Sequence, residues 1–391
     1  MLVQRFDSLT SLQTYCQRWE ELADDCVFRS WTWLTTWWEH YGGDMPDRQL
    51  CVLLVFDQPA DCHTRPLKRS CTENHESVAP HPDQLVAILP TYVERNRARG
   101  QVLRLLGDGE VCSDHLDLLT DPAHAQQATQ AMAEYLCQSA ELWDVADFSG
   151  VDAQSKNLQE LASQLTSEGC DLRRQAGPSC WSIELPETWD KFLALQSKSH
   201  RKQLRRLERQ VLQSDQAIWH RVESQNDFPA AWDILVDLHQ RRRQRLGEPG
   251  CFASDRFSKF HRDVAGKLLE AGQLELAWLE LGGQPIAAEY HLAVGKTVWA
   301  YQGGLDPDRL DEEPGRLSMI CFLQQAIANG CRQLDLLRGD EPYKAHWRAT
   351  PQDTFELQIV PPRSSARWRY RTWTLFRQAG RWARQFTNLL S

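Results

Sequence analysis

The sequence has no long apolar run, and several common catalytic signatures are missing. No stretch reaches the roughly 18 apolar residues that cross a bilayer, and Met1–Asp7 lack a signal-peptide core, so we expect a cytoplasmic protein. Paired Cys-x-x-Cys, Gly-x-Ser-x-Gly and Walker-type Gly-Lys-Ser/Thr motifs are also missing, which disfavours zinc enzymes, hydrolases and nucleotide phosphatases. The 12 cysteines are scattered singly, so we expect reduced thiols and no structural disulfide.

The charge is acidic overall but unevenly distributed. A formal net charge of -9 and a pI near 5.8 disfavour DNA binding by the whole surface, because such binding rests on neutralising phosphates. Residues 361–391 contain seven Arg and no Lys, Asp or Glu, so the rest of the chain carries -16. Any anion site should therefore be local.

The order of periodic segments predicts an α/β or α+β protein of two similar halves. The 391 residues favour two domains, and Gly177-Pro178-Ser179 marks the boundary. We expect domains at 1–178 and 179–360, followed by a tail at 361–391. In the first half we expect helices at 11–22, 31–41, 123–139 and 155–167, and strands at 49–56, 84–92, 102–106, 115–119 and 143–148. In the second half we expect helices at 191–213, 228–246, 255–271 and 315–329, and strands at 181–185, 274–281, 285–293, 297–302, 334–337 and 354–360.

A polar, proline-containing insertion at 57–83 interrupts the first half. It carries Cys62, His63, Cys71, His75 and His81, which are residue types that zinc prefers. Their spacing matches no standard zinc pattern, so we expect a loop and no metal.

One helix in the second half has a strongly basic face. At about 100° per residue, Lys198, Arg201, Lys202, Arg205 and Arg209 fall on one side, and Leu204, Leu207 and Val211 fall opposite. Such a face either meets an anionic ligand or is an ordinary solvated surface.

A second feature is the helix start at Gly315-Arg316-Leu317-Ser318. Free backbone N–H groups and the helix dipole can hold a phosphate there. Asp311, Glu312 and Glu313 oppose this interpretation electrostatically, and a Pro-Gly helix start more often just ends a loop.

A third feature is the end of the strand at 334–337. Asp335 lies on the strand, and Asp340, Tyr343 and Lys344 follow its end. A carboxylate there could take a proton from an amine, and a tyrosine could donate one to a leaving thiolate. Glu289 on the strand at 285–293 is another possible base. Alternatively, Asp340 caps a turn and Tyr343 packs.

These segments resemble the CelD/FemAB-like branch of the GNAT superfamily, the BioF-like acetyltransferase domains. The resemblance rests on "SKSHRKQLRRLERQ", "GGQPIAAEYHLAVGKTVWAYQGGLDPD", "EPGRLSMICFLQQAIANG" and "LDLLRGDEPYKAHW", and more weakly on "SWTWLTTWWEHYG" and "LVAILPTYVERN". It implies two tandem GNAT-like units, each a mixed, mostly antiparallel sheet flanked by helices, of which the first is degenerate. It further implies direct acyl transfer from acetyl-CoA or another acyl-CoA to an amine or hydroxyl of a cell-envelope or polysaccharide precursor.

On this resemblance, the N–H groups of Gly315, Arg316 and Leu317, beside Ser318, would hold the donor phosphates, with Arg201 or Arg205 nearby. Asp335, Asp340, Tyr343 and Lys344 would line the acceptor side. Of the phosphate motif Q/R-x-x-G-x-G/A, only Gly315 is present in Glu312–Leu317. Two alternatives remain: a Fem-like transferase that uses aminoacyl-tRNA, and a non-catalytic scaffold that binds an anionic glycan or nucleotide-linked intermediate.

The tail at 363–390 alternates arginines with aromatic residues. Trp368, Leu375, Ala379, Trp382, Phe386 and Leu390 follow three- and four-residue steps, which predicts an amphipathic helix. It would contact either an anionic membrane surface at the inner membrane face or the acidic body of the protein.

Overall fold

The computed structural model describes residues 1–57 and 80–388, and side chains as far as residue 378. The chain forms two compact units, and we call them the amino-terminal unit (1–24, 28–177 and 355–391) and the carboxyl-terminal unit (25–27 and 178–354). The expected boundary near 178 agrees with this division. The expected end of the second domain at 360 does not, because the strand at 354–360 pairs in the sheet of the amino-terminal unit.

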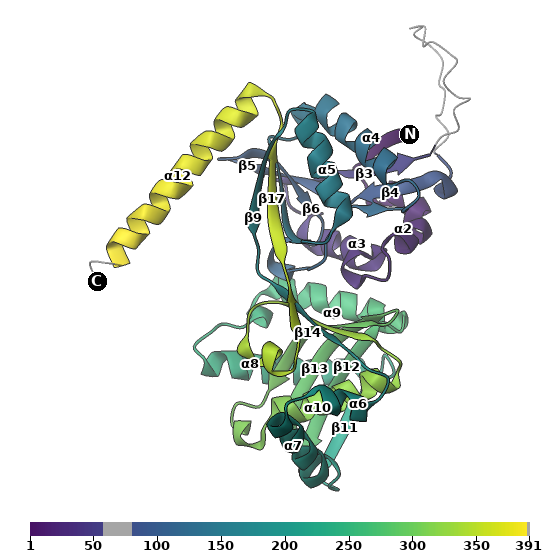
Figure 1. Ribbon diagram of the computed structural model, residues 1–391, viewed down its shortest axis with the longest axis vertical. Coiled ribbons are helices and arrows are strands. Elements are labelled where there is room, and N and C mark those ends of the chain that lie inside the picture. The colour runs from purple at the N-terminus through teal and green to yellow at the C-terminus, as the bar shows by residue number, and fades with distance from the viewer. Residues whose placement is uncertain (58–79, 389–391) are drawn as a thin grey trace. The chain divides into compact units, whose positions relative to one another are not determined.

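The amino-terminal unit contains two sheets, of four and six strands, with helices against them (Figure 1). Its strands are β1 (Leu2–Phe6), β2 (Arg48–Leu50), β3 (Val52–Phe56), β4 (Leu85–Leu89), β5 (Thr91–Asn96), β6 (Gly100–Leu105), β7 (Leu119–Thr120), β8 (Val145–Asp152), β9 (Asp171–Ala176) and β17 (Thr354–Val360). Its helices are α1 (Leu9–Leu12), α2 (Cys16–Leu22), α3 (Trp31–Tyr41), α4 (Ala125–Gln138), α5 (Lys156–Ser167) and α12 (Ser364–Asn388).

Pro90 separates the two sheets of this unit. The sequence predicted one strand at 84–92, but β4 pairs with β3 and β5 pairs with β6. Proline has no N–H to donate to a ladder, so the chain changes sheets at that residue. The second sheet runs β2-β5-β6-β8-β17-β9, in which β6 and β8 are parallel.

The carboxyl-terminal unit has one seven-stranded sheet of order β11-β12-β13-β14-β15-β10-β16. Its strands are β10 (Cys180–Glu184), β11 (Ala217–Arg221), β12 (Leu274–Leu281), β13 (Gln284–Val294), β14 (Thr297–Leu305), β15 (Gln333–Arg338) and β16 (Thr350–Gln352). Its helices are α6 (Trp189–Leu195), α7 (Lys198–Leu207), α8 (Phe228–Arg245), α9 (Asp255–Glu270), α10 (Pro314–Ala328) and α11 (Pro342–His346).

Alternation along β13 assigns helices to the two faces of this sheet. Tyr290 packs against Trp232 of α8 and His261 of α9, whereas its neighbour His291 packs against Phe322 of α10. Successive strand residues point to opposite faces. Therefore α8 and α9 cover one face, and α10, which contacts α6 and α7, covers the other.

Most expected elements are present, with three instructive differences. The helix expected at 191–213 is broken after Leu195, because Ser197 caps a new helix through His200 N. The strand expected at 115–119 is reduced to Leu119–Thr120. The strands β1, β9, β11 and β16 and the short helix α11 were missed. The zinc-like residues Cys62, His63, Cys71 and His75 lie outside the described residues.

Helix α12 is the long terminal helix drawn in yellow in Figure 1. Among the described residues, no helix is long and apolar enough to cross a membrane. The cysteines in the described part of the chain are free thiols.

Candidate active site in the carboxyl-terminal unit

Strands β14 and β15 run parallel for only three residue pairs, from Thr297↔Gln333 to Trp299↔Asp335. Beyond Trp299 the two strands part, although β14 continues to Leu305. Glu289 on β13 pairs with Gly303 in this parted section of β14. The register therefore brings a carboxylate to the place where the sheet opens.

The two glycines of β14 have different neighbours. A Cβ on Gly303 would lie 3.1 Å from Glu289 Oε2, so the glycine leaves the carboxylate uncovered. A Cβ on Gly304 would lie 2.7 Å from the backbone N of His239, so this glycine lets α8 pack closely on the opposite face.

Two buried side chains hold the Glu289 carboxylate. Ser318 Oγ on α10 donates to Glu289 Oε1 at 2.5 Å, and His291 Nε2 lies 3.1 Å from Glu289 Oε2. His291 Nδ1 is buried without a hydrogen-bond partner among the described residues, which favours the tautomer with its proton on Nε2, facing Glu289. No Arg or Lys in the described part of the chain pairs with Glu289. The carboxylate is oriented but not neutralised.

Tyr343 and Cys321 lie close enough to feel the charge of Glu289. Burial, and then the charges of Glu341 and Glu289, raise the pKa of the half-exposed Tyr343, so its phenol stays protonated at neutral pH. Burial, and then the charge of Glu289, raise the pKa of Cys321 to about 12. Cys321 is thus a thiol and not a thiolate nucleophile.

A second polar cluster lies on the α8 and α9 face. Cys251 Sγ lies 3.6 Å from His239 Nε2 and 3.4 Å from Gln302 Nε2, and His261 Nε2 lies 2.9 Å from Tyr301 OH. Burial raises the pKa of Cys251 to about 12, so this Cys–His pair is not an activated nucleophile.

The structure gives Asp335 and Asp340 local structural contacts. Asp335 is buried, and its Oδ1 accepts a hydrogen bond from Leu337 N at 2.7 Å, where Leu337 has a left-handed φ of 57°. Asp340 is exposed, and its Oδ1 accepts from Trp181 Nε1 at 3.0 Å. Both carboxylates therefore support the end of β15.

Lys344 does not line an acceptor site. It is only 2% exposed, and its Nζ donates to the carbonyls of Leu337, Arg338 and Gly339 at 2.9 to 3.0 Å. Glu341 lies 3.0 Å away as its ion-pair partner. The expectation for Lys344 was wrong: its ammonium group ties the turn between β15 and α11 together.

The start of α10 also differs from the expectation. The N–H groups of Arg316 and Leu317 already donate to the carbonyl of Glu313, at 2.9 and 3.1 Å. They are therefore not free for a donor phosphate. Gly315 lies in this turn, while Ser318 points toward Glu289.

The Glu313 carboxylate pairs with the basic side chains next to this helix start. It accepts from Gln203 Nε2 at 2.6 Å and Arg206 at 2.7 Å, and it also pairs with Arg316. Glu313 has a left-handed φ of 58°, which is unfavourable for a residue with a side chain. Its carboxylate contacts therefore stabilise an uncommon backbone conformation.

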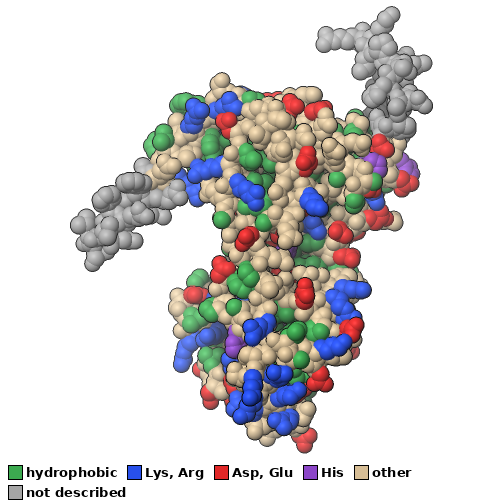
Figure 2. All heavy atoms as spheres, viewed as in Figure 1, with side chains coloured by type: hydrophobic (Ala, Val, Ile, Leu, Met, Phe, Trp, Pro, Cys, Tyr) green, Lys and Arg blue, Asp and Glu red, His purple; other side chains and the backbone are tan. Residues whose placement is uncertain are grey.

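Helix α7 has the expected two faces, but different residues reach α10. Leu204 and Leu207 are buried, and Lys and Arg side chains gather over α7 in Figure 2. The predicted Arg201 and Arg205 make no side-chain hydrogen bond to α10 among the described residues. Gln203 and Arg206 make those contacts instead.

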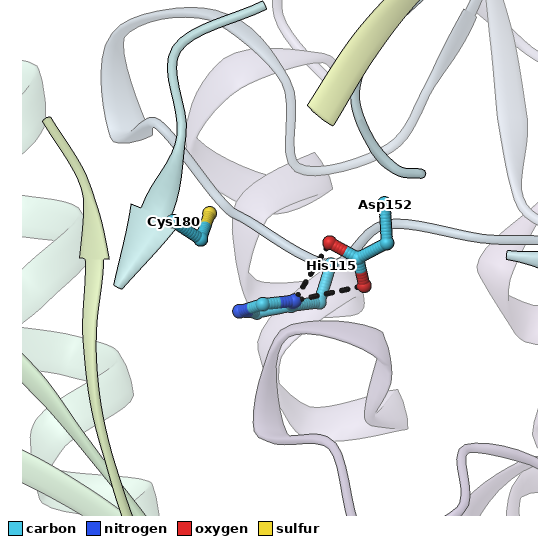
Figure 3. Close-up of side chains that lie close together, drawn as sticks. All are labelled: His115, Asp152 and Cys180. Atoms are coloured by element: carbon cyan, nitrogen blue, oxygen red, sulfur yellow. Dashed lines mark hydrogen bonds and ion pairs between the residues drawn. The ribbon is translucent and has the colours of Figure 1, made fainter. Parts of the chain in front are cut away.

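In the amino-terminal unit the comparable carboxylates are paired with bases. Asp108 accepts from Tyr92 OH at 2.7 Å and Arg104 at 3.0 Å, and Asp147 pairs with Arg99 and Arg104. His115 Nδ1 lies 2.9 Å from Asp152 Oδ2 at the end of β8 (Figure 3). Asp108 and Asp147 thus each have an arginine partner, and Asp152 contacts a histidine.

Residues 198–345 match the family model of the acetyltransferase (GNAT) domain. This segment of the chain is therefore a GNAT domain. This GNAT domain spans α7 to α11 and so contains Glu289, Gly303, Ser318 and Tyr343. Its fold is that of a GNAT acyltransferase.

Two solved structures have a similar fold over nearly the whole chain. The crystal structure of FemX aligns with a TM-score of 0.61 and 9% identity, covering 93% of this chain and 98% of FemX. A conserved protein of unknown function from Bacteroides thetaiotaomicron VPI-5482 aligns with a TM-score of 0.54 and 10% identity, covering 92% of this chain and all of that one. A search of curated proteins finds no match.

Some site residues escaped the sequence analysis. Gly303 and Gly304 form a doubled glycine inside a strand, which is a recognised sign of close backbone approach. Glu313, Gln203 and Arg206 gave no such signal, because their contacts join α7 to α10 across more than a hundred residues. Only the folded structure reveals that arrangement.

Proposed function

We propose that the carboxyl-terminal unit transfers an acyl group from an acyl-CoA to an amine or hydroxyl of a cell-envelope or polysaccharide precursor. The observation that carries this proposal is the Glu289 carboxylate, held by Ser318 and His291 opposite Gly303 where β14 and β15 part. The GNAT family match over residues 198–345 supports acyl transfer as the reaction class.

In this mechanism Glu289 acts as the general base. The acceptor nitrogen or oxygen attacks the thioester carbonyl as its proton passes to Glu289, and the carbon–sulfur bond then breaks. Tyr343 donates a proton to the departing thiolate. Glu289 ends with one extra proton and Tyr343 with one fewer, so a proton returns from Glu289 to Tyr343 before the next turnover. In this step no covalent enzyme intermediate forms.

The acyl-CoA donor has one specific competitor. Glu313 occupies Arg206 and Arg316 at the start of α10, so donor phosphates must compete with a carboxylate there. Exposed Lys202 and Arg205 on α7, with exposed Arg209 in the turn that follows it, suit a longer polyanion. Aminoacyl-tRNA is therefore the second candidate donor.

A donor screen with mass detection tests the proposal. The purified full chain is mixed with acyl-CoAs of increasing chain length and with amine and sugar-amine acceptors, and the acylated product is measured. Calorimetric titration with CoA runs in parallel. We expect acylated product and CoA binding in the micromolar to millimolar range.

Two other results would overturn the acyl-CoA proposal. Undetectable CoA binding at millimolar ligand, with aminoacyl transfer from charged tRNA, would identify the tRNA-dependent reaction. Undetectable transfer from either donor, with binding of an anionic glycan or nucleotide-linked sugar, would identify a non-catalytic scaffold.

A further inference from the structure

The first turns of α12 dock on the amino-terminal unit through one face of the helix. Ala366 is fully buried with Val102, Val145 and Val360, and Tyr370 OH donates to Gln358 Oε1 at 2.7 Å. Arg99 lies over the Trp373 ring, 5.1 Å from its centroid. At about 100° per residue, Ala366, Tyr370 and Trp373 lie within about 60° of one another. This docked face holds the helix in place.

Arginines at the start of α12 are used for this docking. Arg363 donates to Asp144 Oδ1 at 2.8 Å, and Arg367 Nε lies 3.0 Å from Asp171 Oδ2. Arg369 lies at 4.0 Å from Asp144 Oδ2. The acidic residues of the unit therefore attract the start of the helix. This agrees with the alternative in which the tail contacts the acidic body of the protein.

The opposite face of α12 is apolar and exposed. Trp368 is 70% exposed, Leu375 is 64% exposed and Phe376 is 79% exposed. These three side chains fall within about 100° of one another and nearly opposite Ala366 and Tyr370. Large apolar side chains gathered on one exposed helix face mark an interaction surface.

The charge beside this face selects the kind of partner. Arg371 is exposed at its edge and has no acidic partner among the described residues. Residues 361–391 contain no acidic side chain at all. A second copy seated on this face would bring arginine-rich helices together, which costs electrostatic energy. An anionic surface has the complementary sign.

We propose that the Trp368, Leu375 and Phe376 face of α12 binds the surface of an anionic lipid bilayer. The apolar side chains insert at the level of the headgroups and acyl-chain ends, and Arg371 contacts lipid phosphates. The docked face fixes the helix to the amino-terminal unit, so the protein is held at the membrane as a peripheral protein. This inference does not depend on the proposed acyl transfer.

Vesicle co-sedimentation of the full chain tests this inference. Vesicles of phosphatidylcholine alone are compared with vesicles that also contain phosphatidylglycerol, at low and high salt. We expect at least about tenfold tighter binding to the anionic vesicles, and a loss of that preference at high salt.

Two sets of variants assign the binding to this face. We expect the triple substitution Trp368→Ser, Leu375→Ser and Phe376→Ser to weaken binding by about tenfold or more. The matched control, Leu195→Ser with Leu246→Ser, removes exposed apolar side chains of the other unit and should leave binding unchanged. Circular dichroism of both variants checks that the helices are retained.

Three results would overturn the proposal. The first is equal sedimentation of the triple variant and the unchanged chain, and the second is equal loss in the control. The third is a dimer of the unchanged chain in light scattering that the triple substitution converts to a monomer, because that result identifies a second copy as the partner.

Discussion

The two units share a strand plan but differ in what they do with carboxylates. In each unit, antiparallel strands are followed by one strand that pairs in parallel: β8 pairs with β6, and β15 pairs with β14. A further strand lies along the other edge of this parallel strand. That further strand is β17 in the amino-terminal unit and β10 in the carboxyl-terminal unit. The similarity supports the predicted duplication. The units are not consecutive in the sequence, however, because β17 follows the carboxyl-terminal unit in the chain but pairs in a sheet of the amino-terminal unit.

The chemistry differs at the strand before the parallel pair. In the amino-terminal unit this strand is split by Pro90, and the five residues of β4 are all buried and apolar. In the carboxyl-terminal unit β13 is continuous over 11 residues and carries Glu289 and His291. The two units therefore place their carboxylates differently: Asp108 and Asp147 pair with arginines, whereas Glu289 contacts Ser318 and His291 and no arginine or lysine among the described residues.

Substitution of Glu289 should produce the largest difference between the units. Glu289→Gln keeps the size of the side chain and an oxygen that can accept from Ser318 Oγ, but it removes the base, so we expect kcat to fall by about 10²- to 10⁴-fold. The measurement is acyl transfer at saturating donor, with circular dichroism to confirm folding. Asp108→Asn in the amino-terminal unit is the matched control and should change kcat less than twofold, or about 0.4 kcal/mol. A large loss in the control and none in Glu289→Gln would reverse the assignment.

Substitution of Lys344 should destabilise the carboxyl-terminal unit alone. Lys344→Met leaves three carbonyl groups without their shared donor, so the free energy of unfolding should fall by about 3 kcal/mol. Lys191→Met removes an exposed lysine from its pair with Glu187 and should cost less than about 0.5 kcal/mol. Denaturant unfolding checks both. Full stability of Lys344→Met with lost activity would instead support a direct role in catalysis.

Mild acid should change the stability of the two units in opposite directions, through His200 in the carboxyl-terminal unit and Asp117 in the amino-terminal unit. Burial, and then the nearby charges of His346, Arg316 and Arg348, lower the pKa of His200 from 6.5 to about 4. The stability from keeping His200 neutral is present above about pH 6.5 and is lost as the pH falls toward 4, on the order of 2 kcal/mol at pH 5. Burial raises the pKa of Asp117 in the amino-terminal unit to about 6. The stability that comes from keeping Asp117 protonated is therefore lost as the pH rises through 6.

Unfolding curves at pH 7 and pH 5 check these signs. His200→Gln should reduce the acid sensitivity of the carboxyl-terminal unit, and Asp117→Asn should remove the opposing dependence of the amino-terminal unit. An unchanged pH slope in His200→Gln would show that His200 is not the responsible group.

Substitution of Glu313 should produce the smallest effect. Glu313→Gln removes the carboxylate that competes for Arg206 and Arg316, so CoA affinity should rise by up to about tenfold. Glu312→Gln is the control, because Glu312 pairs with Arg309 instead. Calorimetric titration measures both. Weaker CoA binding by Glu313→Gln would mean that the carboxylate mainly supports the loop.

The sequence predicted the architecture better than the site. Periodicity located α8, α9 and α10, whereas the role of Glu289 on β13 as a base stays a prediction. Lys344 was misassigned because its sequence context gives no sign that three backbone carbonyls converge on its ammonium group. The pairing of β17 in the six-stranded sheet of the amino-terminal unit was missed for a similar reason, because pairing between strands far apart in the sequence leaves no local pattern.

Amide hydrogen exchange with and without CoA tests most directly whether the carboxyl-terminal unit holds the reaction centre. We expect slower exchange at the start of α10 and in the parted section of β14 when CoA is added, with β6 and α4 unchanged. Protection confined to β6 and α4, with α10 and β14 unaffected, would contradict it.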